Sequence, residues 1–157
     1  MEEIEMQTIE FKNLSIAKPF SEEYVDEVEA EIGINFPQKY LVLMRKNNGG
    51  APVQQCFTVG MNEKVIERFL SFVENYKVDQ CSIYDIEVVW SQIEDRLEEG
   101  ICPFAALYGG DFLCFDGRFR DEAAIVIWDH EQASLGKSSI TPVADSFEVF
   151  SEMLKEL

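Results

Sequence analysis

Apolar residues near the start of the chain recur at the spacing of one helix face. Val25, Val28 and Ile32 are three or four residues apart, and acidic residues fill most positions between them. This periodicity predicts an amphipathic helix over residues 21–32. Ser21 begins this segment and is a suitable N-cap, followed by glutamates that the helix dipole favours in the first turn.

A second short helix is predicted after Pro37, because proline is favoured in a first turn, where its missing N–H costs nothing. Basic residues follow at the carboxyl end, where cations are favoured. The sequence Asn48-Gly49-Gly50 then ends the helix. Its apolar side consists of Tyr40, Leu41 and Met44. Together the two segments predict a helical hairpin.

The middle of the chain carries strand patterns and one further helix. Residues 54–59 and 65–72 are rich in strand-forming residues. Residues 85–99 give the clearest amphipathic pattern, which Gly100 terminates. Its apolar face carries Ile86, Val89, Trp90, Ile93 and Leu97. We interpret Trp90 as a core anchor.

The last third begins with strand patterns. Residues 101–106 predict a short strand, and the glycine-rich residues 108–110 predict a turn. Residues 112–116 and 124–128 are two apolar runs joined by a short polar loop, which predicts a β-hairpin. Because both runs are apolar at successive positions, we expect this hairpin to be covered on two sides.

A final helix is predicted to begin near Asp145 and Ser146, with Glu148 spaced to complete a capping box. Its docking residues would be Phe147, Phe150, Met153, Leu154 and Leu157. The order of helices, strands, helix, strands and helix predicts an α+β fold. We expect a single domain over residues 1–157.

Charge is the unusual feature of the composition. Thirteen basic residues stand against 30 acidic ones, which gives a net charge of −17. Such a surface repels phosphate backbones and anionic lipids, so we expect no direct binding to nucleic acid or membranes. It would attract a basic protein, although acidic surfaces also serve solubility alone.

The four cysteines favour a reducing environment. They lie in or beside apolar runs and form no C-x-x-C pair, so buried free thiols are predicted rather than a zinc or redox motif. The first residues are acidic and lack an apolar run of signal-peptide length. No stretch approaches the ~20 apolar residues of a membrane span. We therefore expect a cytoplasmic protein.

The candidate chemistry is concentrated in residues 111–131, which contain the only histidine, His130. In a regular strand Asp129 and Glu131 would point to one face and His130 to the other, so these neighbours would not converge on one ion. A calcium or magnesium site built from Asp116, Asp129 and Glu131 across the hairpin is an alternative.

A catalytic interpretation lacks a nucleophile. Cys114, on the neighbouring strand, can approach His130, but a buried and unactivated thiol is inert. No nucleophile-elbow or phosphate-loop motif is present. We therefore expect no catalytic residue, no metal and no cofactor. We interpret His130 as a hydrogen-bonding residue that fixes a turn, and Trp128 as a half-buried ring whose indole N–H is bonded.

Three blocks of the sequence resemble the SUKH superfamily, the Smi/Knr-like proteins. Residues 25–50 hold the two opening helices and end in NNGG, residues 101–116 hold ICPFA and GGDFLCFD, and residues 126–131 read VIWDHE. The motif-bearing part covers about residues 21–157. The resemblance implies an α+β fold that opens with an α-hairpin and has a mixed, mostly antiparallel sheet flanked by helices.

For a bacterial chain, this resemblance implies an immunity protein that occludes the active site of a cognate protein toxin. Such toxins are often basic nucleases or other nucleic-acid-modifying enzymes. One alternative is a Smi/Knr-like regulatory or scaffolding module without a toxin partner. Another is a protein that binds a small ligand or a divalent metal. The sequence does not predict the oligomeric state.

The candidate partner surface combines motif residues with aromatic residues of the flanking turns. From the motifs it takes Asp111, Asp116, Trp128, Asp129, His130 and Glu131, and from the turns it takes Tyr108 and Phe119. Aromatic anchors and charge opposite to the partner are what an inhibitory surface needs. An alternative surface is the acidic helix face that carries Glu94, Asp95 and Glu98.

Overall fold

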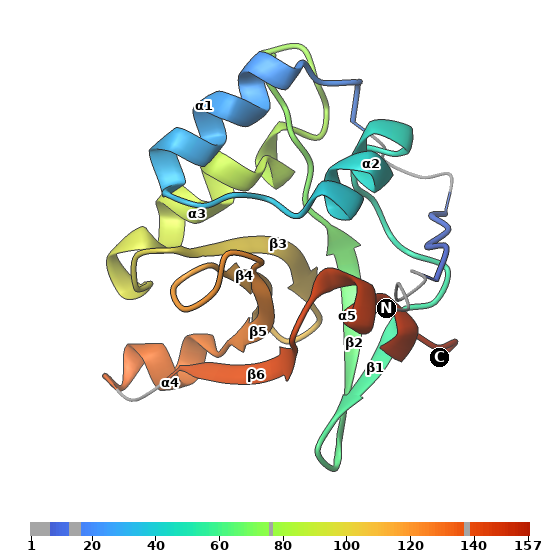
Figure 1. Cartoon of the computed structure of the whole chain (residues 1–157), viewed down its shortest axis with the longest axis vertical. Coiled ribbons are helices and arrows are strands. Elements are labelled where there is room, and N and C mark those ends of the chain that lie inside the picture. Colours follow the sequence, from blue (N-terminus) through green and yellow to red (C-terminus); the bar gives the residue numbers. More distant parts are fainter. Residues whose placement is uncertain (1–6, 13–16, 76, 137–138) are drawn as a thin grey trace.

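A six-stranded sheet organises the fold, with the strands in sequence order across it. The computed structural model describes residues 7–12, 17–75, 77–136 and 139–157. The strands are β1 (Cys56–Val59), β2 (Asn62–Phe69), β3 (Ile101–Leu107), β4 (Phe112–Asp116), β5 (Ala124–Trp128) and β6 (Ile140–Ala144). Each pairs with the next in antiparallel fashion. In Figure 1 the β1–β2 hairpin extends away from the remaining strands.

Helices precede, interrupt and follow the strands, which confirms the predicted α+β class. They are α1 (Glu22–Ile32), α2 (Gln38–Lys46), α3 (Ile86–Ile93), α4 (His130–Ser134) and α5 (Phe147–Met153), with 3₁₀ turns η1 (Ser82–Tyr84) and η2 (Glu94–Arg96). In Figure 1, α1, α2 and α3 gather above β3. The opening helical hairpin and the β4–β5 hairpin have the predicted positions. In the described part of the chain, none of the helices is long and apolar enough to cross a membrane.

Three sequence expectations about the helices were wrong. The third helix is shorter than predicted, because the backbone leaves the helical region at Ile93 (φ −125°, ψ 0°) and continues as η2. The last helix has no capping box, since Ser146 is the N-cap and its side chain accepts from the N–H of Val149. This places Glu148 one position too early to bond back to the cap. Leu157 is 82% exposed and does not dock.

The main core lies between the helices and one face of the sheet, and it is built from aromatic rings. Eight of the twelve phenylalanines are buried. Phe104 of β3 stacks on Phe115 of β4 with ring centroids 4.2 Å apart, and Tyr40 of α2 meets Phe115 edge-on. Phe119 departs from this pattern, because it is 77% exposed in the loop after β4.

The residues that end α2 tie the helical hairpin to the sheet. The buried side chain of Asn48 accepts from the N–H of Phe72 and donates to the carbonyl oxygens of Phe72 and Lys18. Gly49 has a positive φ of 88°, and a Cβ there would lie 2.7 Å from the carbonyl oxygen of Leu70. The NNGG motif therefore acts as a clamp between two chain segments and does more than stop a helix.

The other face of β4 and β5 carries a smaller apolar cluster. Cys114, Val126 and Trp128 belong to it, whereas Phe115 and Ile127 point into the main core. This alternation confirms that the hairpin is covered on two sides. The cluster is completed by Ile93, Ile101 and partly buried neighbours. This second face also carries the largest part of a groove lined by β5 and β6.

Candidate functional site

The structure divides the predicted partner surface between the two ends of the β4–β5 hairpin. Trp128 pairs with Phe112 at one end, and Asp116 pairs with Ala124 at the other. The first end carries Tyr108, Asp111, Trp128, Asp129, His130 and Glu131, and the second carries Asp116 and Phe119. The eight residues therefore do not form one continuous patch around a single point.

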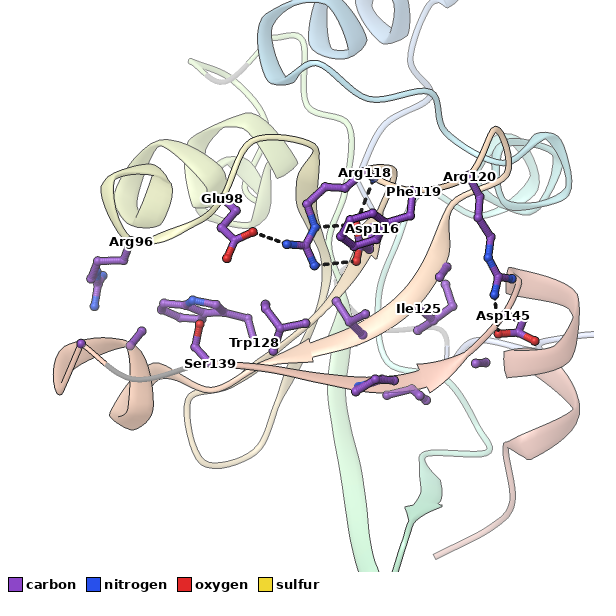
Figure 2. Close-up of a pocket in the computed structure, with 18 residues that line it drawn as sticks. Arg96, Glu98, Asp116, Arg118, Phe119, Arg120, Ile125, Trp128, Ser139 and Asp145 are labelled. Atoms are coloured by element: carbon purple, nitrogen blue, oxygen red, sulfur yellow. Dashed lines mark hydrogen bonds and ion pairs between the residues drawn. The ribbon is translucent and has the colours of Figure 1, made fainter.

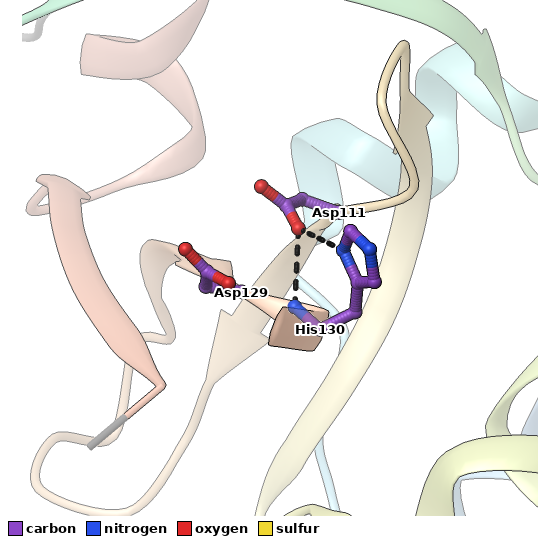
Figure 3. Close-up of side chains that lie close together, drawn as sticks. All are labelled: Asp111, Asp129 and His130. Carbon is purple, nitrogen blue, oxygen red and sulfur yellow. Dashed lines mark hydrogen bonds and ion pairs between the residues drawn. The ribbon is translucent and has the colours of Figure 1, made fainter. Parts of the chain in front are cut away.

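Asp111, Asp129 and His130 form a tight cluster at the first end (Figure 3). Their ligand atoms lie within 4.8 Å of one another. The Oδ1 atom of Asp111 accepts from the backbone N–H of His130 at 3.1 Å and lies 2.6 Å from its Nδ1. Asp129 caps α4, because its side chain accepts from the N–H groups of Glu131 and Gln132.

The sequence-based expectation that the strand continues through residues 129–131 was wrong. β5 ends at Trp128, and the chain turns into α4 at His130, so the alternation of side chains between two faces stops there. The alternative metal site is not assembled either. Asp116 lies at the far end of the hairpin from Asp129, and both carboxylates are occupied by hydrogen bonds to protein donors.

The arrangement confirms the interpretation of His130 as a hydrogen-bonding residue that fixes a turn. Its ring lies against Gly110, where an added Cβ would come within 3.0 Å of the imidazole Cε1. The hydrogen bond and the negative charge of Asp111 raise the pKa of His130 above its usual value. The pair therefore connects the β3–β4 turn to the start of α4.

Cys114 does not supply a nucleophile to this cluster. It is buried in the second apolar cluster, opposite Val126 rather than beside His130. Burial, followed by the charge of Asp116, raises the pKa of the Cys114 thiol well above its usual range. A thiol in that state is unreactive. All four cysteines are buried and free, as the sequence predicted.

Trp128 differs from its prediction in two respects. It is 1% exposed rather than half-buried, and its indole Nε1 has no hydrogen-bond acceptor among the described residues. A ring in this position cannot serve as an exposed anchor for a partner. Asp116, at 7% exposure, is likewise covered. The side chains of the predicted surface that remain accessible include Tyr108, Glu131 and Phe119.

A groove with a volume of about 750 Å³ lies on the second face of the sheet. We call it the outer groove (Figure 2). Its floor is formed by Val126 and Trp128 of β5 together with Ile140 and Pro142 of β6. No pattern in the sequence predicted this groove, because its walls come from segments between residues 96 and 145 that only folding brings together.

Charged side chains form the wall of the outer groove. Arg118 donates through Nε and Nη2 to the two carboxylate oxygens of Asp116, each at 2.9 Å, and through Nη1 to Glu98. These bonds hold the pKa of Asp116 below its usual value, although burial alone would raise it. We call this set the Arg118 brace, because it joins the loop after β4 to the segment before β3 (Figure 2).

Comparison with known proteins bears on the resemblance of the three sequence blocks. The model of the SMI1/KNR4 family (SUKH-1) matches residues 19–153. No curated protein matches the chain. The matched region begins just before α1 and ends with α5, so it includes the helical hairpin, the whole sheet and the outer groove. The chain therefore belongs to the SMI1/KNR4 (SUKH-1) family.

Proposed function

We propose that this protein is a cytoplasmic immunity protein that binds a cognate bacterial toxin and covers its active site. Membership of the SUKH-1 family carries the proposal, and the net charge of −17 supports a basic partner such as a nuclease. Opposite charges steer the two proteins together and raise the association rate at low salt. The protein needs no catalysis of its own for this role.

The accessible residues at the first end of the hairpin are our candidate contacts. Tyr108 is 62% exposed in the β3–β4 turn, and Glu131 is exposed in the first turn of α4. Tyrosine is a frequent energetic centre of interfaces, because it combines a rigid apolar ring with a polar tip. The Asp129 side chain accepts from the backbone N–H of Glu131 and fixes the start of α4, and the N–H of Tyr108 donates to the carbonyl oxygen of Val65. Phe119 offers a second anchor at the other end.

Co-expression with the toxin encoded beside its gene tests the proposal. We expect the protein to protect the cell and to bind the isolated toxin domain, with weaker binding at about 300 mM than at about 50 mM salt, since screening shortens the range of the attraction. Survival that is no better than with an empty vector would exclude the immunity role and favour a regulatory or scaffolding module.

The contact surface has its own test. Replacing Tyr108 by Ala should weaken toxin binding by at least about tenfold, the order expected when one aromatic anchor is lost. The matched control is Met61→Ala, because Met61 is fully exposed at the tip of the β1–β2 hairpin, away from the site. If both variants bind like the wild type, the partner contacts another surface, such as the acidic face of Glu94, Asp95 and Glu98.

A further inference from the structure

A second hollow, with a volume of about 510 Å³, lies between the carboxyl end of α1 and the segment that joins α3 to β3. In Figure 1 the helices α1 and α3 lie side by side above the sheet. The Trp90 side chain packs against the main core but remains partly exposed and lines this hollow, as does Leu97. We call it the Trp90 pocket. Its volume falls within the range of sites that bind ligands.

The charged side chains that line the Trp90 pocket are all acidic. They are Glu31 of α1, Glu94 of η2, and Glu98 and Glu99 before β3. Glu98 bonds Arg118, whereas the other three form no ion pair with any described residue. The outer groove differs, because its arginines and carboxylates balance one another. Uncompensated carboxylates around a hollow favour a cationic occupant.

The carboxyl end of α1 adds to this negative potential. The carbonyl oxygens of Ala30, Glu31 and Ile32 accept no hydrogen bond from the described part of the chain, and α1 has no basic residue in its last turn. The negative end of the helix dipole therefore lies at the pocket without a cation. On the α3 side, burial, followed by repulsion from carboxylates that include Glu31, raises the pKa of Glu87 above its usual value.

A guanidinium suits this pocket better than an ammonium group. The carboxylates and the free carbonyl oxygens only accept hydrogen bonds, so the occupant must donate them. Arginine carries five N–H groups around a flat cation whose face packs on aromatic rings, such as the partly exposed ring of Trp90. The same pairing occurs beside the pocket, where Arg118, which bonds Glu98, lies over the Phe119 ring at 4.6 Å from its centroid (Figure 2). Phe119 is largely exposed, so an apolar contact adjoins the pocket.

We propose that the Trp90 pocket receives an arginine side chain of the partner protein. The guanidinium packs on Trp90 and donates to Glu31 from α1 and to Glu94 from η2. Phe119 contacts an apolar residue of the partner near that arginine. The inference rests on the proposed function in taking the occupant from a basic protein, and it adds a contact at the end of the β4–β5 hairpin that carries Phe119.

The test uses capped peptides and the indole signal of Trp90 in a proton–nitrogen NMR spectrum. The probes are acetyl-Gly-Arg-Gly-amide and two versions with Lys or citrulline in place of Arg. The chain has two tryptophans, and Trp90→Phe identifies the Trp90 signal by its loss. If that variant does not fold, hydrogen exchange distinguishes the two signals, because the indole N–H of Trp128 is buried.

We expect the Arg peptide to shift the Trp90 signal saturably at millimolar concentrations, the Lys peptide to bind several-fold more weakly, and the uncharged citrulline peptide not to bind. The double variant Glu31→Gln, Glu94→Gln should weaken binding of the Arg peptide by about tenfold. The matched control is Glu67→Gln, Glu152→Gln, which removes the same charge from exposed positions of β2 and α5 outside the pocket. It should bind within about twofold of the wild type, because salt screens distant exposed charges.

Three results would overturn the inference. One is the absence of a saturable shift at Trp90, the second is equal binding of the Arg and Lys peptides, and the third is an equal effect of the two double variants. None of these measurements needs a toxin, so their failure leaves the proposed function intact. If the Arg peptide binds but the protein does not protect cells, the immunity role is removed and the pocket remains a site for an arginine of another basic protein.

Discussion

The Arg118 brace provides a quantitative test of the structure, through the variant Arg118→Ala. This change removes the guanidinium that bonds both oxygens of the Asp116 carboxylate, while the backbone N–H of residue 118 still donates to Asp116 at 3.0 Å. Asp116 is only 7% exposed, so water cannot easily replace the lost donors. A covered carboxylate would then be left with incomplete hydrogen bonding.

The magnitude follows from those contacts. A hydrogen bond to a charged group contributes about 1.5–3 kcal/mol, and two such bonds are lost. Arg118 is 20% exposed and Asp116 keeps one backbone donor, so we take the low end and expect a loss of about 2 kcal/mol. Arg120→Ala is the matched control. The Arg120–Asp145 pair is exposed on both sides, and such pairs contribute about 0–1 kcal/mol.

The effect of Arg118→Ala should depend on pH in a defined direction. The pKa of Asp116 in the folded protein lies below its usual value of 3.8. Well above pH 3.8 the carboxylate is charged in both states, and the brace contributes fully to stability. As the pH falls through the lower folded pKa, Asp116 becomes protonated and that contribution is lost. The difference between wild type and variant should therefore shrink below about pH 3.8.

Urea unfolding at pH 7 and at about pH 3, followed by circular dichroism, measures both quantities. We expect Arg118→Ala to lower the free energy of unfolding at pH 7 by about 2 kcal/mol, and Arg120→Ala by less than about 1 kcal/mol. Equal effects of the two variants would refute the claim that the Arg118 brace stabilises the fold. So would a deficit of Arg118→Ala that is undiminished at pH 3, because it would not arise from the charged form of Asp116.

Two further predictions concern the cluster at α4 and the clamp after α2. The pKa of the single histidine, measured by NMR, should lie above its usual value of 6.5, and Asp111→Asn should lower that pKa. The His130–Asp111 pair should stabilise the fold below pH 6.5 and lose this effect as the pH rises through the raised pKa. An unchanged pKa in Asp111→Asn would contradict this prediction. Gly49→Ala should cost more than about 2 kcal/mol of unfolding free energy, because its Cβ would collide with the Ser71 side chain and the Leu70 carbonyl. Gly60→Ala, also at positive φ but in open space, should cost about 1 kcal/mol, and similar losses would argue against the clamp.

The sequence alone determined those parts of the fold that depend on local patterns. Helical periodicity and capping residues located α1 and α2, and two apolar runs around a polar loop located β4 and β5 with their observed bounds. The three motif blocks indicated the family, and the family model that matches residues 19–153 confirmed it. These signals succeed because each is contained within a short segment, where spacing and turn chemistry fix the conformation.

Other features depend on contacts between distant segments, and only the tertiary structure decided them. β6 contains Pro142 and gives a weak strand signal, but it completes the sheet as an edge strand, where proline is tolerated. Trp128 is buried because β5 is covered on both faces, and the outer groove exists because residues between 96 and 145 converge there. Sequence spacing cannot give this information, since burial and the pairing of charges depend on which segments pack together.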